Sequence, residues 1–231
     1  MANPINNTKK PSPKGPITFQ IQLNEEQKAV KRSALEKDVT IITGNWGTGK
    51  TLVASNIALD LFFNKKVNKI ILTRPIDFRP TGALPGTLEE KLDIFVMPLK
   101  QNLYACYKDR AKLDKMFEEK AIQVLPIDYL RGFTITDAVM IVDEINEMTY
   151  EDFKLILTRL GTGSKLIFTG SEEQVIKRSN DCIAKIKCLK DCPHVGFHEL
   201  TANHRSDSIP HIIDFINKFE KECIKALVDN K

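Results

Sequence analysis

The sequence lacks any long apolar run. No stretch of its 231 residues approaches the roughly 20 apolar residues that a membrane-spanning helix requires. The opening residues, MANPINNTKKPSPKGPITFQ, also contain no apolar segment of the kind found in secretory signal peptides. A chain of this length is most easily accommodated as one domain. We therefore expect a single cytoplasmic domain that makes no contact with a membrane.

After residue 20 the sequence has no excess of charge of either sign. The formal net charge is +4, and residues 1–20 contribute three lysines and no acidic residue to it. The rest of the chain is nearly neutral. We expect a flexible basic tail over residues 1–19, which acts as a solvated linker or adds weak affinity for a polyanion. The domain itself is then expected over residues 20–231.

The sequence has only five cysteines. This small, odd number argues against a disulfide framework. Four potential zinc ligands nevertheless lie close together in the sequence. Their spacing, C-x5-C-x3-C-x-H, differs from the paired short C-x2-4-C arrangement of structural zinc sites. We expect reduced thiols, and zinc is the alternative. The ligands of that alternative site would be Cys182, Cys188, Cys192 and His194.

What the sequence does contain, from residue 39 onward, is an alternation of short apolar runs with longer helical patterns. Apolar residues recur at helical spacing over 88–103 and 153–160, and again over 209–219, where we expect a last helix packed on the sheet. The alternation predicts an α/β fold with a mostly parallel sheet and helices on both faces. The runs that predict strands are 39–43, 69–73, 121–126, 138–142, 165–169 and 195–200.

The stretch GNWGTGKT matches the G-x4-G-K-[ST] pattern of a phosphate-binding loop. It follows a predicted strand and opens a predicted helix, so its backbone amides and the helix dipole can both face a phosphate. Lys50 is expected to neutralise β- and γ-phosphate oxygens, and the Thr51 hydroxyl to ligate Mg²⁺. The residues expected to contact nucleotide are Gly44, Asn45, Trp46, Gly47, Thr48, Gly49, Lys50 and Thr51.

A second motif lies in AVMIVDEINEMT, where a predicted buried strand ends in Asp143 and Glu144. We interpret it as a Walker B motif, in which Asp143 holds Mg²⁺ through its water shell. Glu144 would orient or deprotonate the attacking water, a role that separates hydrolases from kinases among P-loop proteins. The alternative is an acidic helix start, because Asp and Glu suit a first helical turn. The position directly after four apolar strand residues favours the catalytic interpretation.

Three further stretches resemble the PhoH family, a single-core relative of superfamily 1 helicases. They are RPIDFRPTGALPGTLEEKLDIFVMPL, YLRGFTITDAVMIVDE and LTRLGTGSKLIFTGSEEQ. The resemblance covers about residues 20–217. It implies a single RecA-like P-loop NTPase core that uses ATP and Mg²⁺ and hydrolyses ATP.

The resemblance also implies roles for residues at both ends of the domain. LNEEQ is similar to the helicase Q motif, which implies that Gln27 reads the adenine edge. LTANHRS resembles L-x-x-N-Y-R-S, which implies that Arg205 approaches the γ-phosphate. Each role has an alternative. Asn24 and Gln27 also fit a capping box that binds the helix's own amides, and Arg205 fits a surface arginine before a helix.

One motif departs from the family pattern T-G-D-x-x-Q, because Ser171 stands where the family has Asp. Serine carries no charge, so the coupling of hydrolysis to motion is in doubt, and Glu172 is a candidate to compensate. Gln174 remains to sense the γ-phosphate or its attacking water. DEINEMT likewise replaces the family's D-E-A-Q-N, which changes the start of the next helix and leaves the acidic pair intact.

Residues 74–99 are the candidate for contact with a polynucleotide, because helicase-like cores bind one across the outer ends of their strands. Their mixture of Pro, Gly, basic and aromatic residues suits a strand-binding loop, and it equally suits a solvated loop. The resemblance favours single-stranded RNA or DNA. The residues expected to bind it are Arg74, Phe78, Arg79, Lys91 and, before the Walker B strand, Arg131.

These features favour an ATPase that acts on single-stranded nucleic acid, and RNA is favoured over DNA. Such an ATPase could work as a helicase-type motor. The alternative is a non-motor module whose bound ATP recruits a partner protein or a nuclease. Because the sequence has one core, an arginine from a second core is missing, and it has to come from a neighbouring subunit or not at all. The resemblance implies a homo-oligomeric ring, a hexamer. Arg159 is the candidate donor, and a cation that only stabilises a helix C-terminus is the alternative.

Overall fold

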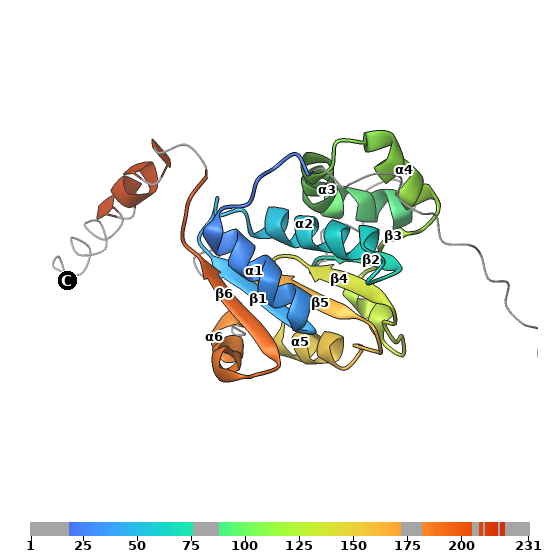
Figure 1. Ribbon diagram of the computed structural model, residues 1–231. Helices are drawn as coiled ribbons and strands as arrows, with labels where there is room; N and C mark the ends of the chain where they lie inside the picture. The colour runs from blue at the N-terminus through green and yellow to red at the C-terminus, as the bar shows by residue number, and fades with distance from the viewer. Residues whose placement is uncertain are drawn as a thin grey trace, which may run out of the picture.

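A single sheet of six parallel strands organises the protein in the computed structural model (Figure 1). The order across the sheet is β3-β2-β4-β5-β1-β6, so β5 alone separates β1 from β4. The structure describes residues 19–75, 88–171, 182–204, 208–209, 211–216 and 218–219, and within α3 it describes no side chain for residues 88–93 and 95. The strands are β1 (Val39–Gly44), β2 (Lys69–Thr73), β3 (Ile122–Val124), β4 (Ala138–Val142), β5 (Lys165–Thr169) and β6 (Val195–Leu200).

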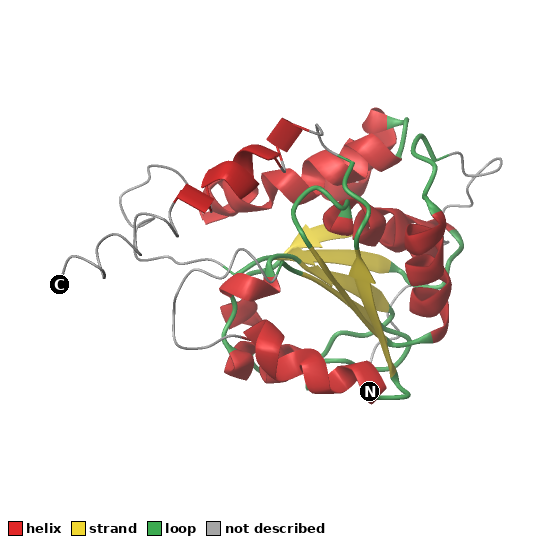
Figure 2. Ribbon diagram, turned by 90° about the vertical axis from the view of Figure 1, so that its left-hand side faces the viewer, coloured by secondary structure: helices red, strands yellow, loops and turns green. Residues whose placement is uncertain are grey.

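Helices cover both faces of this sheet, as Figure 2 shows from the side. One layer contains the first four helices and the other contains the last two. The helices are α1 (Glu25–Glu36), α2 (Lys50–Phe63), α3 (Leu88–Cys106), α4 (Arg110–Glu118), α5 (Tyr150–Leu157) and α6 (Cys182–Ile186). Short 3-10 turns are η2 (Ile127–Leu130), η3 (Ile145–Glu147) and η4 (Lys187–Asp191).

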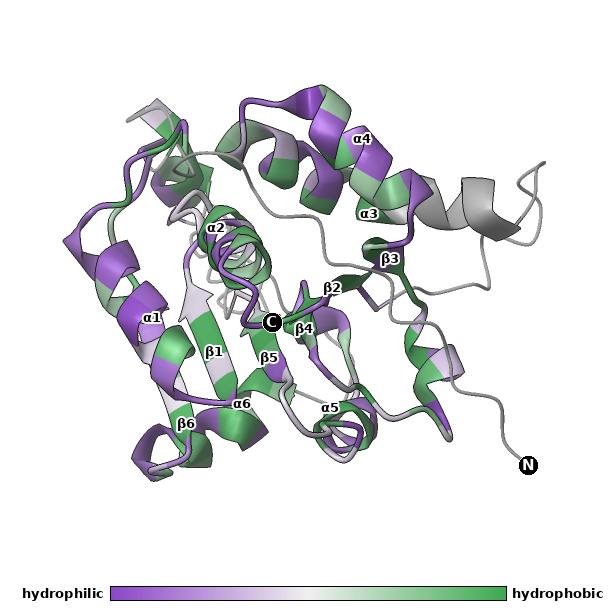
Figure 3. Cartoon of the chain, turned by 45° about the vertical axis from the view of Figure 1, so that its right-hand side comes forward, coloured by the Kyte–Doolittle hydropathy of each residue, from purple (hydrophilic) through white to green (hydrophobic). Residues whose placement is uncertain are grey.

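The alternation of side chains along each strand divides the core into two halves. Ile42, Ile70 and Ile167 face the layer of α1 to α4, whereas their neighbours Ile41, Ile71 and Phe168 face α5 and α6. A fully buried side chain of this size contributes roughly 1.5–3 kcal/mol. Figure 3 shows the hydrophobic residues gathered on the strands. Because both faces are apolar, polar groups with a function are left for the ends of the strands.

The predicted fold class is confirmed. The strands expected at 69–73, 138–142, 165–169 and 195–200 have these bounds, the first strand runs one residue further, to Gly44, and the strand expected at 121–126 is shorter. The helix expected over 88–103 is α3. Residues 88–99 therefore lie in a helix and not in the loop that was expected over 74–99. Pro98 lies within this helix.

The prediction that the last helix packs on the sheet is wrong. Described residues between 208 and 219 are helical, but their apolar side chains are exposed, among them Phe215 at 74%. Both faces of the sheet are already covered, and Figure 1 shows this helix beyond the end of β6, apart from the two layers. The other exposed apolar residues of the helix are Ile209, Ile212, Ile213, Ile216 and Phe219.

Three further expectations concern the ends of the chain and metals. Residues 1–18 of the predicted tail lie outside the described residues, and Phe19 pairs with Tyr107 at the edge of α3. None of the helices described is long and apolar enough to cross a membrane. In the described ranges, no three His, Cys, Asp or Glu side chains lie close enough to hold a metal ion; Cys182 is buried while Cys188 is exposed.

Candidate functional site

The turn between β1 and α2 is a loop of backbone groups at the carboxyl end of the sheet. Gly47 and Gly49 have φ of 80° and 82°, a left-handed conformation that glycine adopts at little cost. Gly49 is the N-cap residue of α2. No side chain of the described residues forms a capping hydrogen bond at this end of the helix. The first amides of α2 therefore point out of the turn without a side-chain acceptor, an arrangement suited to an anion.

The Lys50 side chain folds back over this loop. Its ammonium donates to the carbonyl oxygens of Gly44 at 2.9 Å and Asn45 at 2.7 Å. Thr48 is buried and its hydroxyl donates to the Asn45 carbonyl at 2.9 Å, which closes the loop from inside. Trp46 is half-buried and Asn45 is exposed. The positive charge of Lys50 thus lies against the backbone carbonyls of the loop.

The carboxylate of Asp143 links this loop to the ends of two strands. Its Oδ1 atom accepts a hydrogen bond from the Thr51 hydroxyl at 2.9 Å and another from the Thr169 hydroxyl. Asp143 follows β4, Thr169 ends β5, and Thr51 lies in the first turn of α2. Asp143 is only 3% exposed. A buried carboxylate needs such donors, since burial without them would carry a large cost.

Glu144 is held in an unusual backbone conformation beside Asp143. Its φ of 56° is left-handed, which is uncommon for a residue with a side chain. The Oε2 atom is buried and has no hydrogen-bond partner among the described residues. Burial raises the pKa of Glu144 and the charge of Asp143 raises it further, while Arg74 and a hydrogen bond from Asn146 oppose them. The carboxylate is thus a stronger base than an exposed one.

The end of β5 is joined to the turn after β4 through Asn146. The amide of Ser171 donates to Asn146 Oδ1 at 3.1 Å, so the Asn146 side chain contacts both Glu144 and the segment after β5. Ser171 is fully buried, and its hydroxyl has no hydrogen-bond partner among the described residues. Thr73 Oγ1, at the end of β2, is also buried without a hydrogen-bond partner among the described residues. Three unpaired oxygens therefore lie at the carboxyl ends of neighbouring strands.

Helix α1 begins with the capping box that was one of two alternatives for Asn24 and Gln27. The Gln27 amide donates to Asn24 Oδ1 at 2.8 Å, and the Asn24 amide donates to Gln27 Oε1 at 3.1 Å. The same Gln27 side chain donates from Nε2 to the Thr48 carbonyl at 3.3 Å. Gln27 therefore caps its own helix and also attaches α1 to the phosphate loop.

A family model for PhoH-like proteins matches residues 21–217. The chain belongs to the PhoH family. A PhoH-like protein from Synechocystis is 39% identical over 185 residues, which cover 77% of this chain and 55% of that protein. The protein PhoH of Escherichia coli is 31% identical over 160 residues, 65% of this chain and 44% of that protein. This chain spans about half the length of these PhoH relatives.

Solved structures with a similar arrangement include helicases. The Pif1 helicase from Candida albicans shares 18% identity at a TM-score of 0.47, covering 86% of this chain and 44% of that chain. The UvsW helicase from Bacteriophage T4 shares 14% identity at a TM-score of 0.46, covering 79% and 61%. Both scores are below 0.5, so membership of the PhoH family rests on sequence. The parallel sheet with the phosphate loop after β1 is a RecA-like P-loop NTPase core.

The other predicted site residues lie apart from the loop or outside the described residues. Arg74 follows β2, and its guanidinium lies 3.4 Å from Glu147 Oε1. Arg131 is exposed in the turn after η2. Arg159 follows α5 at the opposite, amino edge of the sheet, where its carbonyl accepts from the Ile135 amide. Phe78, Arg79, Gln174, Arg205 and the side chain of Lys91 lie outside the described residues.

The structure adds site residues that the sequence analysis did not single out. Thr169 and Asn146 contact the Walker B pair, and Thr73 ends the neighbouring strand. Thr169 was recognisable as the first residue of the PhoH strand-end motif. Asn146 stands where the family motif D-E-A-Q-N has Gln, but its contact with the Ser171 amide, 25 positions away, left no local signal.

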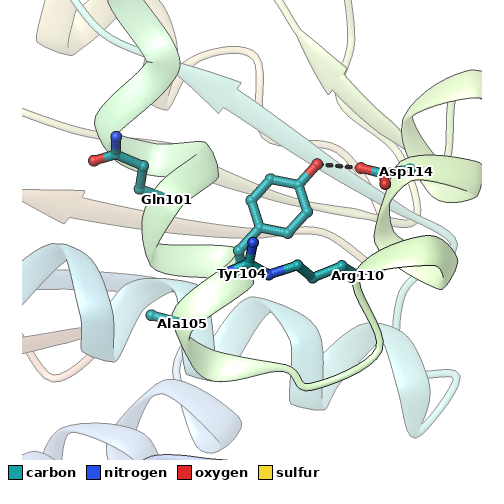
Figure 4. Close-up of a pocket in the computed structure, with 5 residues that line it drawn as sticks. All are labelled: Gln101, Tyr104, Ala105, Arg110 and Asp114. Carbon is teal, nitrogen blue, oxygen red and sulfur yellow. Dashed lines mark hydrogen bonds between the residues drawn. The ribbon is translucent and has the colours of Figure 1, made fainter.

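The pocket between α3 and α4 is separate from this site. It has a volume of about 430 Å³, and Figure 4 shows Tyr104 across it, donating to Asp114. None of its lining residues belongs to the phosphate loop or the Walker B pair. Apart from Tyr104, the lining residues are exposed: Gln101, Ala105, Arg110 and Asp114. The candidate functional site is therefore the one at the carboxyl ends of β1, β4 and β5.

Gly44→Ala should destabilise the protein far more than its matched control, Gly132→Ala. Both glycines have positive φ, 140° and 78°, a conformation that costs a residue with a side chain roughly 1–3 kcal/mol. A Cβ at Gly44 would also lie 2.3 Å from the Leu200 carbonyl oxygen, whereas one at Gly132 meets nothing within 4 Å. Denaturant unfolding should show a loss at least about 2 kcal/mol larger for Gly44→Ala. Equal losses would show that β6 moves aside freely.

Proposed function

We propose that this protein binds and hydrolyses ATP and acts on or with single-stranded nucleic acid, RNA in particular. The observation that carries the proposal is the contact between the Thr51 hydroxyl and the Asp143 carboxylate at 2.9 Å. It joins the phosphate loop to the strand end that carries Glu144. Phosphate-binding amides, an oxygen pair suited to a hard cation and a buried base therefore meet at one edge of the sheet.

A triphosphate would take over hydrogen-bonding groups that already lie together at this loop. The amides at the start of α2 would receive the β-phosphate, and the Lys50 ammonium would exchange the carbonyls of Gly44 and Asn45 for phosphate oxygens. Thr51 and Asp143 offer the oxygen ligands that Mg²⁺ prefers, so they fit this cation. Bound there, Mg²⁺ would neutralise charge that develops on the phosphates.

Hydrolysis depends on Glu144 in this proposal. Its buried Oε2 has no protein donor among the described residues and can accept a proton from a water molecule. Burial raises the pKa of this carboxyl, which makes the carboxylate a better general base. Asn146 forms a hydrogen bond with Glu144 and accepts one from the Ser171 amide, so it joins the base to the end of β5.

Contact with nucleic acid is supported by two features, one exposed and one half-buried. Arg131 is exposed between two exposed rings, Tyr129 at 61% and Phe133 at 45%, and such rings stack on bases with little sequence preference. Arg74 pairs with Glu147 and lies close enough to Glu144 to affect its charge. A nucleic-acid phosphate that bound Arg74 would change the electrostatic surroundings of the catalytic base.

Single-stranded RNA should stimulate ATP hydrolysis by the wild-type protein. Phosphate release is measured with increasing RNA, and with DNA of the same sequence in parallel. Glu144→Gln keeps the shape of the site but removes the base, so turnover should fall by roughly 10²-fold or more while ATP still binds. Native turnover in this variant would contradict the role of Glu144.

Control variants separate the parts of this proposal. Lys50→Ala should abolish ATP binding, whereas Tyr129→Ala should weaken RNA binding and leave ATP binding unchanged. Tyr129→Phe keeps the ring and should bind RNA normally. Slow turnover that RNA never changes would favour the alternative, a module whose bound ATP recruits a partner protein or a nuclease.

We also propose a homo-oligomeric ring, a hexamer, in which Arg159 reaches the γ-phosphate of a neighbouring copy. Within one chain Arg159 lies at the edge of the sheet opposite the phosphate loop, so donation would have to occur between copies. Its Nη2 atom contacts only the adjacent Thr158 hydroxyl by a hydrogen bond in the described structure, and its Nε is buried without an acceptor there. Stabilisation of the end of α5 is the competing role.

Mixing two inactive variants tests donation between copies. Arg159→Ala subunits keep the phosphate loop, and Lys50→Ala subunits keep the arginine, so mixed rings contain complete sites. We expect ATPase activity to recover after subunits exchange. Full activity of Arg159→Ala alone, or a strictly monomeric protein under assay conditions, would contradict the proposal.

A further inference from the structure

Residues 201–204, which follow β6, are attached to both α1 and the phosphate loop. The Glu26 carboxylate accepts from the Thr201 amide at 3.2 Å, the Thr201 hydroxyl at 2.5 Å and the Ala202 amide at 3.3 Å. The His204 amide donates to the Gly47 carbonyl at 3.0 Å. This segment is therefore held by the first turn of α1 and by the loop that would receive the phosphates.

The His204 ring contacts the two side-chain amides of the α1 capping box. Its Nε2 atom lies 3.1 Å from Asn24 Nδ2 and 3.4 Å from Gln27 Nε2. The capping box fixes both amide orientations, because each amide oxygen already accepts a backbone hydrogen bond. Both NH₂ groups consequently face the ring. His204 Nε2 has to act as an acceptor, which places the proton of the neutral ring on Nδ1.

The Gln27 amide is covered by these contacts. Gln27 is 3% exposed, and its NH₂ group is shared between His204 and the Thr48 carbonyl. Thr48 belongs to the backbone of the phosphate loop and is buried, whereas His204 is exposed and can turn away. A ligand that binds the Gln27 amide has to replace the ring. Adenine offers the same acceptor as His204 Nε2, an unprotonated ring nitrogen, at N7.

We propose that the His204 ring occupies the base-recognition position of the nucleotide-free protein, and that adenine displaces it. The inference rests on the proposed ATP site and adds that this site competes with a residue of its own chain. Displacement would break the contacts of the ring with α1 and loosen residues 201–204 next to Gly47. Adenine binding would thus change the contacts of residues 201–204 with α1 and with the phosphate loop.

Calorimetry with ATP and with inorganic tripolyphosphate tests the competition, because tripolyphosphate carries no base. Titrations are made at mildly alkaline pH, where histidine is neutral. His204→Ala should bind ATP roughly 3- to 10-fold more tightly, the range expected for removal of a competing hydrogen bond, with unchanged affinity for tripolyphosphate. His204→Gln again offers an acceptor to the two amides and should bind ATP like the wild type. His194→Ala, at another exposed histidine, is the control and should change neither affinity.

Each other outcome contradicts the competition in a recognisable way. Weaker ATP binding by His204→Ala, with tripolyphosphate unchanged, would show that the ring holds the base instead of competing with it. An equal change for both ligands would show that His204 acts through the phosphate loop, and no change would show that it does not cover the base position. If the wild-type protein bound neither ligand, the proposed ATP site would be rejected and the competition with it.

Discussion

The buried carboxylate of Asp143 is the group on which the arrangement of this site depends. Its Oδ1 atom accepts hydrogen bonds from the hydroxyl groups of Thr51 and Thr169. These two bonds hold the start of α2 against the ends of β4 and β5. A parallel sheet brings these three points to one edge, because all its strands end there. The core contributes by keeping both faces apolar, which leaves the strand ends as the place for polar side chains.

Around Asp143 the structure leaves several polar groups without partners, and this distinguishes the site from a merely well-packed strand end. Glu144 is held at a left-handed φ with a buried, unpaired oxygen, while the hydroxyls of Thr73 and Ser171 are also buried and unpaired. Such groups reduce stability unless a ligand or water satisfies them. Ser171 is uncharged and is joined to the turn that carries Glu144 through Asn146.

Much of this architecture could be predicted from the sequence, because its causes are local. Short apolar runs gave the strands, and the glycine pattern between a strand and a helix located the phosphate loop. The failures have tertiary causes. Residues 209–219 have the pattern of a buried helix, but no free face of the sheet remains to receive it. The partnership of Asn146 with Ser171, and that of His204 with α1, join residues distant in the chain and leave no periodic signal.

The Mg²⁺ dependence of ATP binding tests the central claim that Thr51, at the start of α2, and Asp143, after β4, form a metal site beside the phosphate-binding loop. Asp143→Asn is the informative variant, since an amide oxygen can still accept from both threonines while the negative charge is lost. Titration of ATP with and without Mg²⁺ should show that the metal strengthens binding to the wild-type protein and adds little in Asp143→Asn. If Mg²⁺ strengthened binding equally in both proteins, Asp143 would not hold the metal and the account of the site would be wrong.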